Sequence, residues 1–103
     1  MYVVSIKRIK DKKGNELPEE KQEFEYLMLF KNEIKDGNKT TKTQIPCFGA
    51  EKHAILFPTV GAARDWFKNN KKLILNIGLS EYDTKTLAIR KRIYKQINAG
   101  SLL

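Results

Sequence analysis

The spacing of the apolar residues changes at Pro58-Thr59, and this change constrains the fold more than any other feature of the sequence. Before Pro58, apolar residues recur at every second position, which is the period of a β-strand with one buried face. Directly after Thr59 they recur at every third or fourth position, which is the period of an α-helix. Strands that cluster early and helices that follow late are typical of an α+β fold.

Three segments in the first half of the chain alternate between apolar and polar residues. Residues 2–9, 23–32 and 40–48 are therefore predicted to be strands. The sequence Asp36-Gly37-Asn38 indicates a tight turn between the last two, because glycine accepts a positive φ at low cost. Pro46 has no N–H to donate to a neighbouring strand, so the third segment is expected at a sheet edge or a bulge.

The region around Pro58 supplies a helix between two shorter strands. Residues 52–57 are a candidate for a fourth strand and residues 73–77 for a fifth. Between them, Thr59 is a suitable N-terminal cap for a helix that is expected to end at Asn69-Asn70.

Residues 81–98 predict a second helix, capped by Ser80 and stopped by Gly100. Its apolar stripe recurs at intervals of three and four residues: Leu79, Tyr82, Thr86, Ile89, Ile93 and Ile97. A strand over residues 87–97 is the alternative. Its alternation fails at Lys91 and Lys95, so we favour the helix.

The predicted fold is one α+β domain over residues 1–103. Its antiparallel sheet has four to five strands in the order β-β-β-β-α-β-α, and two helices pack on one face. A sheet covered in this way is expected to bury the aromatic side chains at alternating and helical positions. These are Tyr2, Phe24, Tyr26, Phe30, Phe57, Trp66 and Phe67.

Positive charge is concentrated in the second half of the chain. The chain has 20 basic and 12 acidic residues, a net charge of +8. Residues 51–103 hold 10 basic and 4 acidic side chains, and no acid follows Asp83. A surplus of this size attracts polyanions.

The outer faces of the two predicted helices carry most of the basic side chains of residues 51–103. They form a candidate nucleic-acid interface that consists of Arg64, Lys68, Lys71, Lys72, Lys91, Arg92 and Lys95. Rows of this kind bind phosphate backbones by neutralising charge and releasing counterions. The sequence thus predicts a small, non-catalytic nucleic-acid-binding accessory protein, for DNA or RNA.

The same charge layout also fits a protein-interaction module. As a regulator or inhibitor, such a module would bind an acidic surface of its partner. The threonine-rich segment 40–48 is a further contact candidate, because an unpaired strand edge can pair with another chain. The protein is accordingly expected to be a monomer or an edge-strand homodimer.

Signatures of catalysis are weak in this sequence. Cys47 and His53 are the only thiol and imidazole, and Cys47 follows Pro46 in a strand rather than opening a helix. One Cys and one His are too few for a structural zinc site. The helix start at residues 59–62 lacks a glycine-rich phosphate motif. We therefore expect no enzyme activity, metal or cofactor.

Location is indicated by composition alone. A single cysteine fits a reducing cytoplasm better than secretion. No apolar run is long enough to span a membrane, and residues 1–10 lack the apolar core of a signal peptide. No motif in the chain identifies a family.

Overall fold

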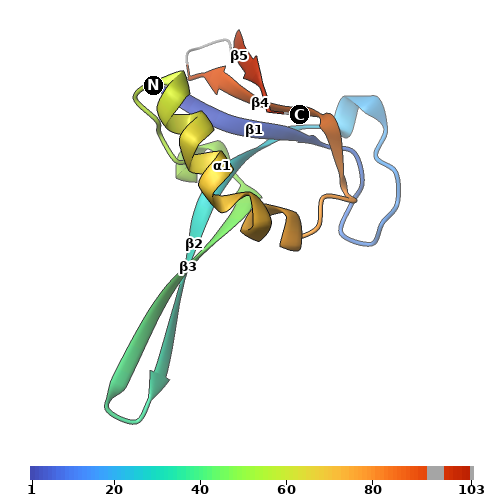
Figure 1. The fold of residues 1–103 in the computed structure, drawn as a ribbon. Helices are drawn as coiled ribbons and strands as arrows, with labels where there is room; N and C mark the ends of the chain where they lie inside the picture. Colours follow the sequence, from blue (N-terminus) through green and yellow to red (C-terminus); the bar gives the residue numbers. More distant parts are fainter. Residues whose placement is uncertain (93–96, 103) are drawn as a thin grey trace.

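Five strands form one antiparallel sheet in the order β3-β2-β1-β4-β5 (Figure 1). The computed structural model describes residues 1–92 and 97–102. The strands are β1 (Tyr2–Arg8), β2 (Phe24–Asp36), β3 (Lys39–Gly49), β4 (Tyr82–Lys91) and β5 (Ile97–Ser101). In this part of the chain there is one α-helix, α1 (Val60–Asn76), and two short 3₁₀ turns, η1 (Glu19–Lys21) and η2 (Glu51–His53).

The core lies between α1 and one face of the sheet. β1 is the central strand, and its residues Val3, Val4, Ser5 and Ile6 are fully buried. The apolar side chains on the helix-facing side of the sheet meet one stripe of α1. This core consists of Val4, Ile6, Leu27, Phe57, Ala63, Phe67, Ile74, Leu87 and Ile89.

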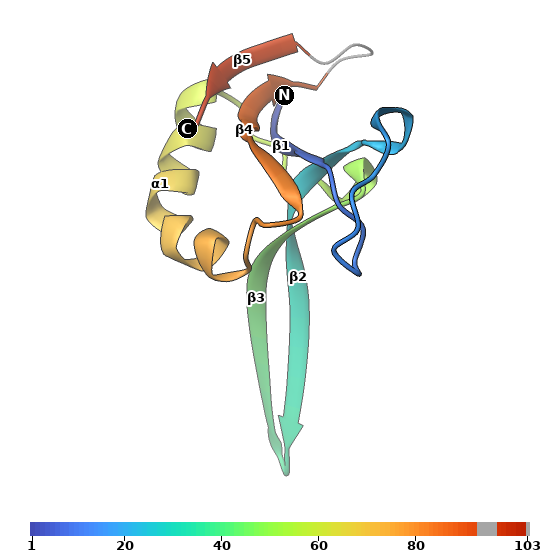
Figure 2. The ribbon, with the colours of Figure 1, turned by 90° about the vertical axis from the view of Figure 1, so that its right-hand side faces the viewer.

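The β2–β3 hairpin extends far beyond this core as a two-stranded ribbon (Figures 1 and 2). Its strands pair over their whole length, from Tyr26 opposite Gly49 to Asp36 opposite Lys39. Residues 30–45, which we call the arm, are all exposed. The arm turns at Gly37, whose φ of 60° at the first central position matches a type II′ hairpin turn.

Several sequence predictions are confirmed. The fold is α+β with an antiparallel sheet, and the three early strands and the turn at Gly37 are present. α1 begins after Thr59, whose side chain accepts a hydrogen bond from the N–H of Ala62 at 3.0 Å. Pro46 lies in β3, which is an edge strand of the sheet.

The helix predicted over residues 81–98 is wrong where the structure describes the chain. Residues 82–91 form β4 and residues 97–101 belong to β5, while residues 93–96 lie outside the described residues. Without β4, the free edge of β1 would leave buried backbone groups unpaired. β4 pairs there, with Ile89 opposite Val4, and buries Leu87 and Ile89 on one face at the period of a strand. This tertiary pairing outweighs the helical spacing of the stripe.

Two further strand predictions are also wrong. Residues 73–76 are the last turn of α1, because Ile74 continues the buried stripe of Ala63 and Phe67. Asn70 does not stop the helix, since its side-chain amide donates to the carbonyl of Trp66 at 2.8 Å. Residues 52–57 hold the end of η2 and an extended stretch in which only Phe57 bridges to β1, opposite Tyr2.

The structure therefore has one described α-helix instead of two. It covers a single face of the sheet, as Figure 2 shows with α1 to the left of β1 and β4. None of the helices in the described ranges is both long and apolar enough to cross a membrane.

Candidate nucleic-acid interface

The exposed side of α1 carries a row of four basic side chains. Arg64, Lys68, Lys71 and Lys72 are all exposed and lie outside the stripe that packs on the sheet. Arg64 and Lys72 are eight positions apart, which is about 12 Å along the helix axis. The structure therefore brings together the four α1 residues of the predicted interface.

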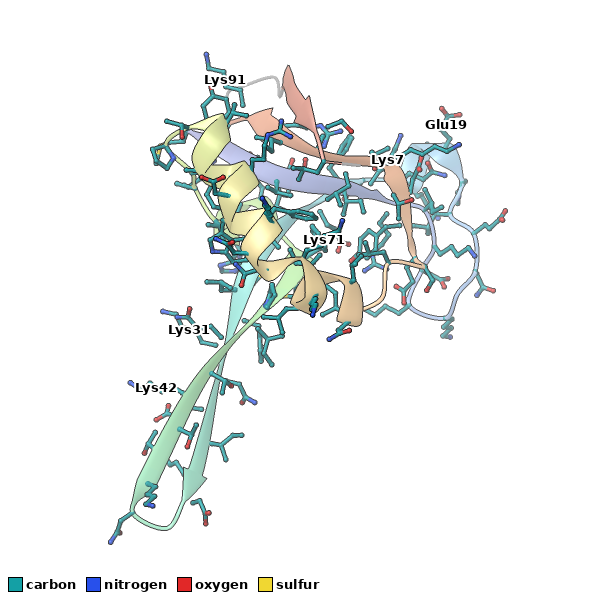
Figure 3. The ribbon with its side chains drawn as sticks, viewed as in Figure 1. Lys7, Glu19, Lys31, Lys42, Lys71 and Lys91 are labelled. Carbon is teal, nitrogen blue, oxygen red and sulfur yellow. The ribbon has the colours of Figure 1, made fainter. Side chains whose placement is uncertain are left out.

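Arg64 carries this row to the edge of the sheet. A Cβ atom added to Gly100 of β5 would stand 3.0 Å from the Arg64 guanidinium, so the two residues lie in contact. Gly100 pairs with Ile89, two positions before β4 ends at the exposed Lys91. Figure 3 shows Lys91 projecting from this end of the sheet and Lys71 on the helix. The row thus runs from α1 toward the end of β4.

The other predicted interface residues contribute less. The Nε of Arg92 lies 3.9 Å from the Glu51 carboxylate, so its charge is partly balanced. Lys95 lies outside the described residues. Asp65 is exposed on α1 beside the row and reduces its net charge.

A polar cluster joins three strands on the helix-facing side of the sheet. Arg8 donates from Nε to Glu25 at 2.6 Å and from Nη2 to the Tyr82 hydroxyl at 2.7 Å, and it pairs with Glu81. The Tyr82 hydroxyl donates to Glu25 at 2.7 Å. The hydrogen bonds that Arg8 donates to Glu25 raise the pKa of Arg8, and burial raises the pKa of Tyr82. Both shifts keep Arg8 charged and Tyr82 neutral at neutral pH. A group that transfers protons instead needs a pKa near the operating pH, so the cluster fits a structural role.

A surface depression of about 610 Å³ borders this cluster. Its lining includes Arg8, Glu25, Phe24 and Phe48, together with residues of the loop between β1 and β2. Arg8 and Glu25 are already bonded to each other, so the depression offers no free acid–base pair at that point.

The thiol and imidazole also differ from a catalytic arrangement. Cys47 is half-buried in β3, and burial raises the pKa of its thiol, which keeps it protonated and weakly nucleophilic at neutral pH. His53 is exposed in η2. Within residues 1–92 and 97–102, no three His, Cys, Asp or Glu side chains gather to hold a metal ion.

Sequence reasoning missed the exposure of aromatic residues on β2. Phe57 and Phe67 are buried as expected, but Phe24 and Phe30 are 37% and 55% exposed, so their predicted burial is wrong. They lie on the face of the sheet that α1 does not cover. The signal for the arm was present in residues 31–44, where Ile34 is the only large apolar residue. A strand pair that lacks apolar side chains has no face to pack against a hydrophobic core, so it is expected to be exposed.

The same uncovered face is held together by Arg90. Its Nη1 donates to the carbonyl and hydroxyl of Ser5 at 3.0 and 2.8 Å, and its Nη2 donates to the carbonyl of Thr86 at 2.9 Å. The guanidinium carbon lies 4.3 Å from the ring centroid of Phe24. Burial lowers the pKa of Arg90, but a guanidinium remains charged at neutral pH. A fixed cation therefore lies against an exposed aromatic ring.

The chain matches no family model, no curated protein and no solved structure.

Proposed function

We propose that this protein is a small, non-catalytic nucleic-acid-binding accessory protein. The observation that carries the proposal is the row of exposed cations on α1, which continues through Arg64 toward Lys91 at the end of β4. Side chains arranged along one line neutralise successive phosphates, and the release of counterions drives binding. We infer that it acts in the cytoplasm, where a free cysteine such as Cys47 stays reduced.

The experiment is a binding titration with three labelled probes: duplex DNA, single-stranded DNA and RNA. Fluorescence anisotropy is measured at about 50 and about 200 mM salt. Over this range, the added salt lowers the affinity of a protein that makes six to ten phosphate contacts by about 10³- to 10⁵-fold. Fewer contacts give a proportionally shallower slope.

The variant that tests the row is Lys68→Gln, Lys71→Gln, Lys72→Gln. Loss of three phosphate contacts lowers the slope of log affinity against log salt by about 2.7 for a duplex and about 2.1 for a single strand. A matched control is Lys12→Gln, Lys13→Gln, Lys21→Gln, because these lysines are also exposed but lie in the loop between β1 and β2. Equal losses in both variants would mean that net charge matters and the row does not. No binding to any probe at low salt would refute the function.

A protein-interaction module is the second candidate, and one observation favours it. β3 is an edge strand, and the part of it within the arm is exposed. Such an edge offers unpaired backbone groups to another strand. An acidic partner would then meet the basic row. A pull-down with nuclease-treated lysate tests this candidate, and recovery of no protein while nucleic acid still binds would count against it.

A further inference from the structure

The face of the sheet opposite α1 presents three aromatic side chains of β2: Phe24, Tyr26 two positions on, and Phe30 four positions further, with Met28 between the last two. Phe24 and Phe30 are 37% and 55% exposed, and Tyr26 between them is half-buried. Phe24 stacks against Arg90, whose side chain binds Ser5 on this face. Since strand residues two apart share a face, Tyr26 and Phe30 lie on the same side as Phe24. We call Phe24, Tyr26, Phe30 and Arg90 the aromatic face.

We propose that the aromatic face binds the unstacked bases of a single-stranded nucleic acid. The inference rests on the proposed function and specifies its ligand. Exposed aromatic rings beside fixed cations are what single-strand binding requires, because every base has a face that can stack and every nucleotide carries a phosphate. Stacking of this kind does not depend on base sequence, so the recognition is expected to be broad.

The spacing of the rings selects a single strand over a duplex. At about 3.4 Å per residue, Phe24 and Tyr26 lie about 6.8 Å apart along the strand, and Tyr26 and Phe30 about 13.6 Å. Successive bases of a duplex are separated by only about 3.4 Å and are covered on both faces by their neighbours. One base per ring is therefore possible only where the strand is extended and its bases are separated, as in single-stranded segments.

The charges on this face are complementary to phosphate along its aromatic stretch. Strand pairing places two carboxylates on this face among the described residues, and each lies opposite a lysine: Asp83 opposite Lys7, and Asp36 opposite Lys39 at the arm tip. Between these ends stands Arg90. Lys31 and Lys42, which Figure 3 shows on the arm, lie on the opposite face, because Lys31 follows Phe30 directly and Lys42 pairs with Glu33. Arg90 is therefore the cation that stands beside the aromatic rings.

A second copy of the chain is the other possible occupant, and the available area argues against it. The ribbon along β2, from Phe24 to Asp36, is 13 residues long, which gives a length of about 44 Å, and two strands have a width of about 10 Å. This plane of about 440 Å² is roughly half of the 800 Å² that each partner buries in a typical stable interface. Bases that stack on single rings need no such area.

The test compares wild type with Phe30→Leu and with Phe24→Leu, Phe30→Leu. Leucine keeps an apolar side chain but removes the ring, so it separates stacking from hydrophobic contact. The double variant also removes the contact between Phe24 and Arg90, which could disturb the fold. The single variant Phe30→Leu avoids this, because Phe30 lies in the arm, away from the core. The control is Leu56→Ala, which removes another exposed apolar side chain, 39% exposed, far along the chain from β2.

Binding of a 20-nucleotide oligothymidine and of a 20-base-pair duplex is measured by anisotropy, and sedimentation velocity gives the mass. We expect the double variant to bind oligothymidine about 10-fold more weakly or worse, and the single variant about 5-fold more weakly. Duplex affinity and the salt slope stay within about 2-fold of wild type, as does all binding by Leu56→Ala. The salt slope stays because phosphate contacts are unchanged.

Each contrary result has a distinct meaning. If wild type binds neither probe, the proposed function falls and the aromatic face falls with it. If wild type binds both probes and the leucine variants bind equally well, the aromatic face alone is overturned. If the leucine variants instead convert a dimer to a monomer without weakening oligothymidine binding, the face is an interface between copies and our inference is wrong.

Discussion

The Nε of Arg8 lies 2.6 Å from a carboxylate oxygen of Glu25, which joins β1 to β2 on the helix-facing side of the sheet. The side chains are 20% and 23% exposed, so solvent screens the pair only in part. The Tyr82 hydroxyl bonds to both, which extends the link to β4. One guanidinium thus connects the three consecutive strands β2, β1 and β4.

Replacement of Arg8 is expected to destabilise the fold. Arg8→Ala leaves the Glu25 carboxylate without its cation, and we expect the free energy of unfolding to fall by about 2 kcal/mol. Arg8→Lys keeps the charge but not the two-pronged donor geometry, so its loss is about half as large. Urea unfolding followed by circular dichroism measures both. An unchanged midpoint for Arg8→Ala would show that the cluster is not stabilising.

The raised pKa of Tyr82 predicts a loss of stability at alkaline pH. Burial and the hydrogen bond to Glu25 hold the phenol neutral in the folded protein. Above pH about 10 the unfolded chain releases this proton while the folded chain keeps it. The unfolded state then binds fewer protons, so stability falls as the pH rises. This contribution is complete below that pH and is lost above it.

Tyr82→Phe isolates this effect from the other groups that titrate at high pH. The variant lacks two hydrogen bonds and is expected to be about 1 kcal/mol less stable at pH 8. Because it has no phenol to ionise at this position, the difference from wild type narrows above pH 10. Denaturant unfolding at several pH values measures the difference. A gap that stays constant up to pH 11 would contradict the role given to the Tyr82 proton.

Segments whose own residues determine their structure were predictable from the sequence. Val4 and Ile6 alternate in β1, and Thr59 caps α1, because these patterns need no knowledge of the rest of the chain. The basic row was predictable for the same reason, since helical spacing alone places Arg64, Lys68 and Lys72 on one side. The four basic residues of α1 are therefore the part of the candidate interface that the sequence predicts by itself.

Segments whose structure depends on a distant partner were not predictable. Ile89 fits a helical stripe and a strand equally well, and its pairing with Val4 decides between them. The exposure of Phe24 depends on which face of the sheet α1 covers, and Phe24 lies on the other face. Alternation reports which side chains share a face but not what covers it.

The cap of α1 supplies a local test of helix stability. The Thr59 hydroxyl accepts a hydrogen bond from the N–H of Ala62 at 3.0 Å, which satisfies a donor that has no partner within the helix. We expect Thr59→Ala to cost about 1 kcal/mol and to lower the melting temperature by about 4–8 °C. Thr59→Ser keeps the oxygen and should melt close to wild type. Equal melting of all three proteins would show that the cap is not needed.

The arm is expected to be the least protected part of the sheet. All residues from 30 to 45 are exposed, whereas the central strand β1 is buried on both faces. Opening of a ribbon that buries no side chains costs little free energy, so its amides exchange with solvent while those of β1 stay protected. Hydrogen–deuterium exchange followed by mass spectrometry on peptides from residues 31–44 and 2–8 measures this contrast.

Shortening the arm tests the same property by a second route. Removal of residues 33–42, with Asn-Gly joining Asn32 to Thr43, keeps a two-residue hairpin and removes only exposed positions. We expect the melting temperature to change by no more than about 4 °C, which corresponds to less than about 1 kcal/mol in a domain of this size. The core retains every residue that packs against α1, so it has no reason to weaken. Two results together would contradict this expectation: amides of the arm protected as well as those of β1, and a large fall in melting temperature on shortening. They would mean that the arm packs against protein in solution and is not exposed.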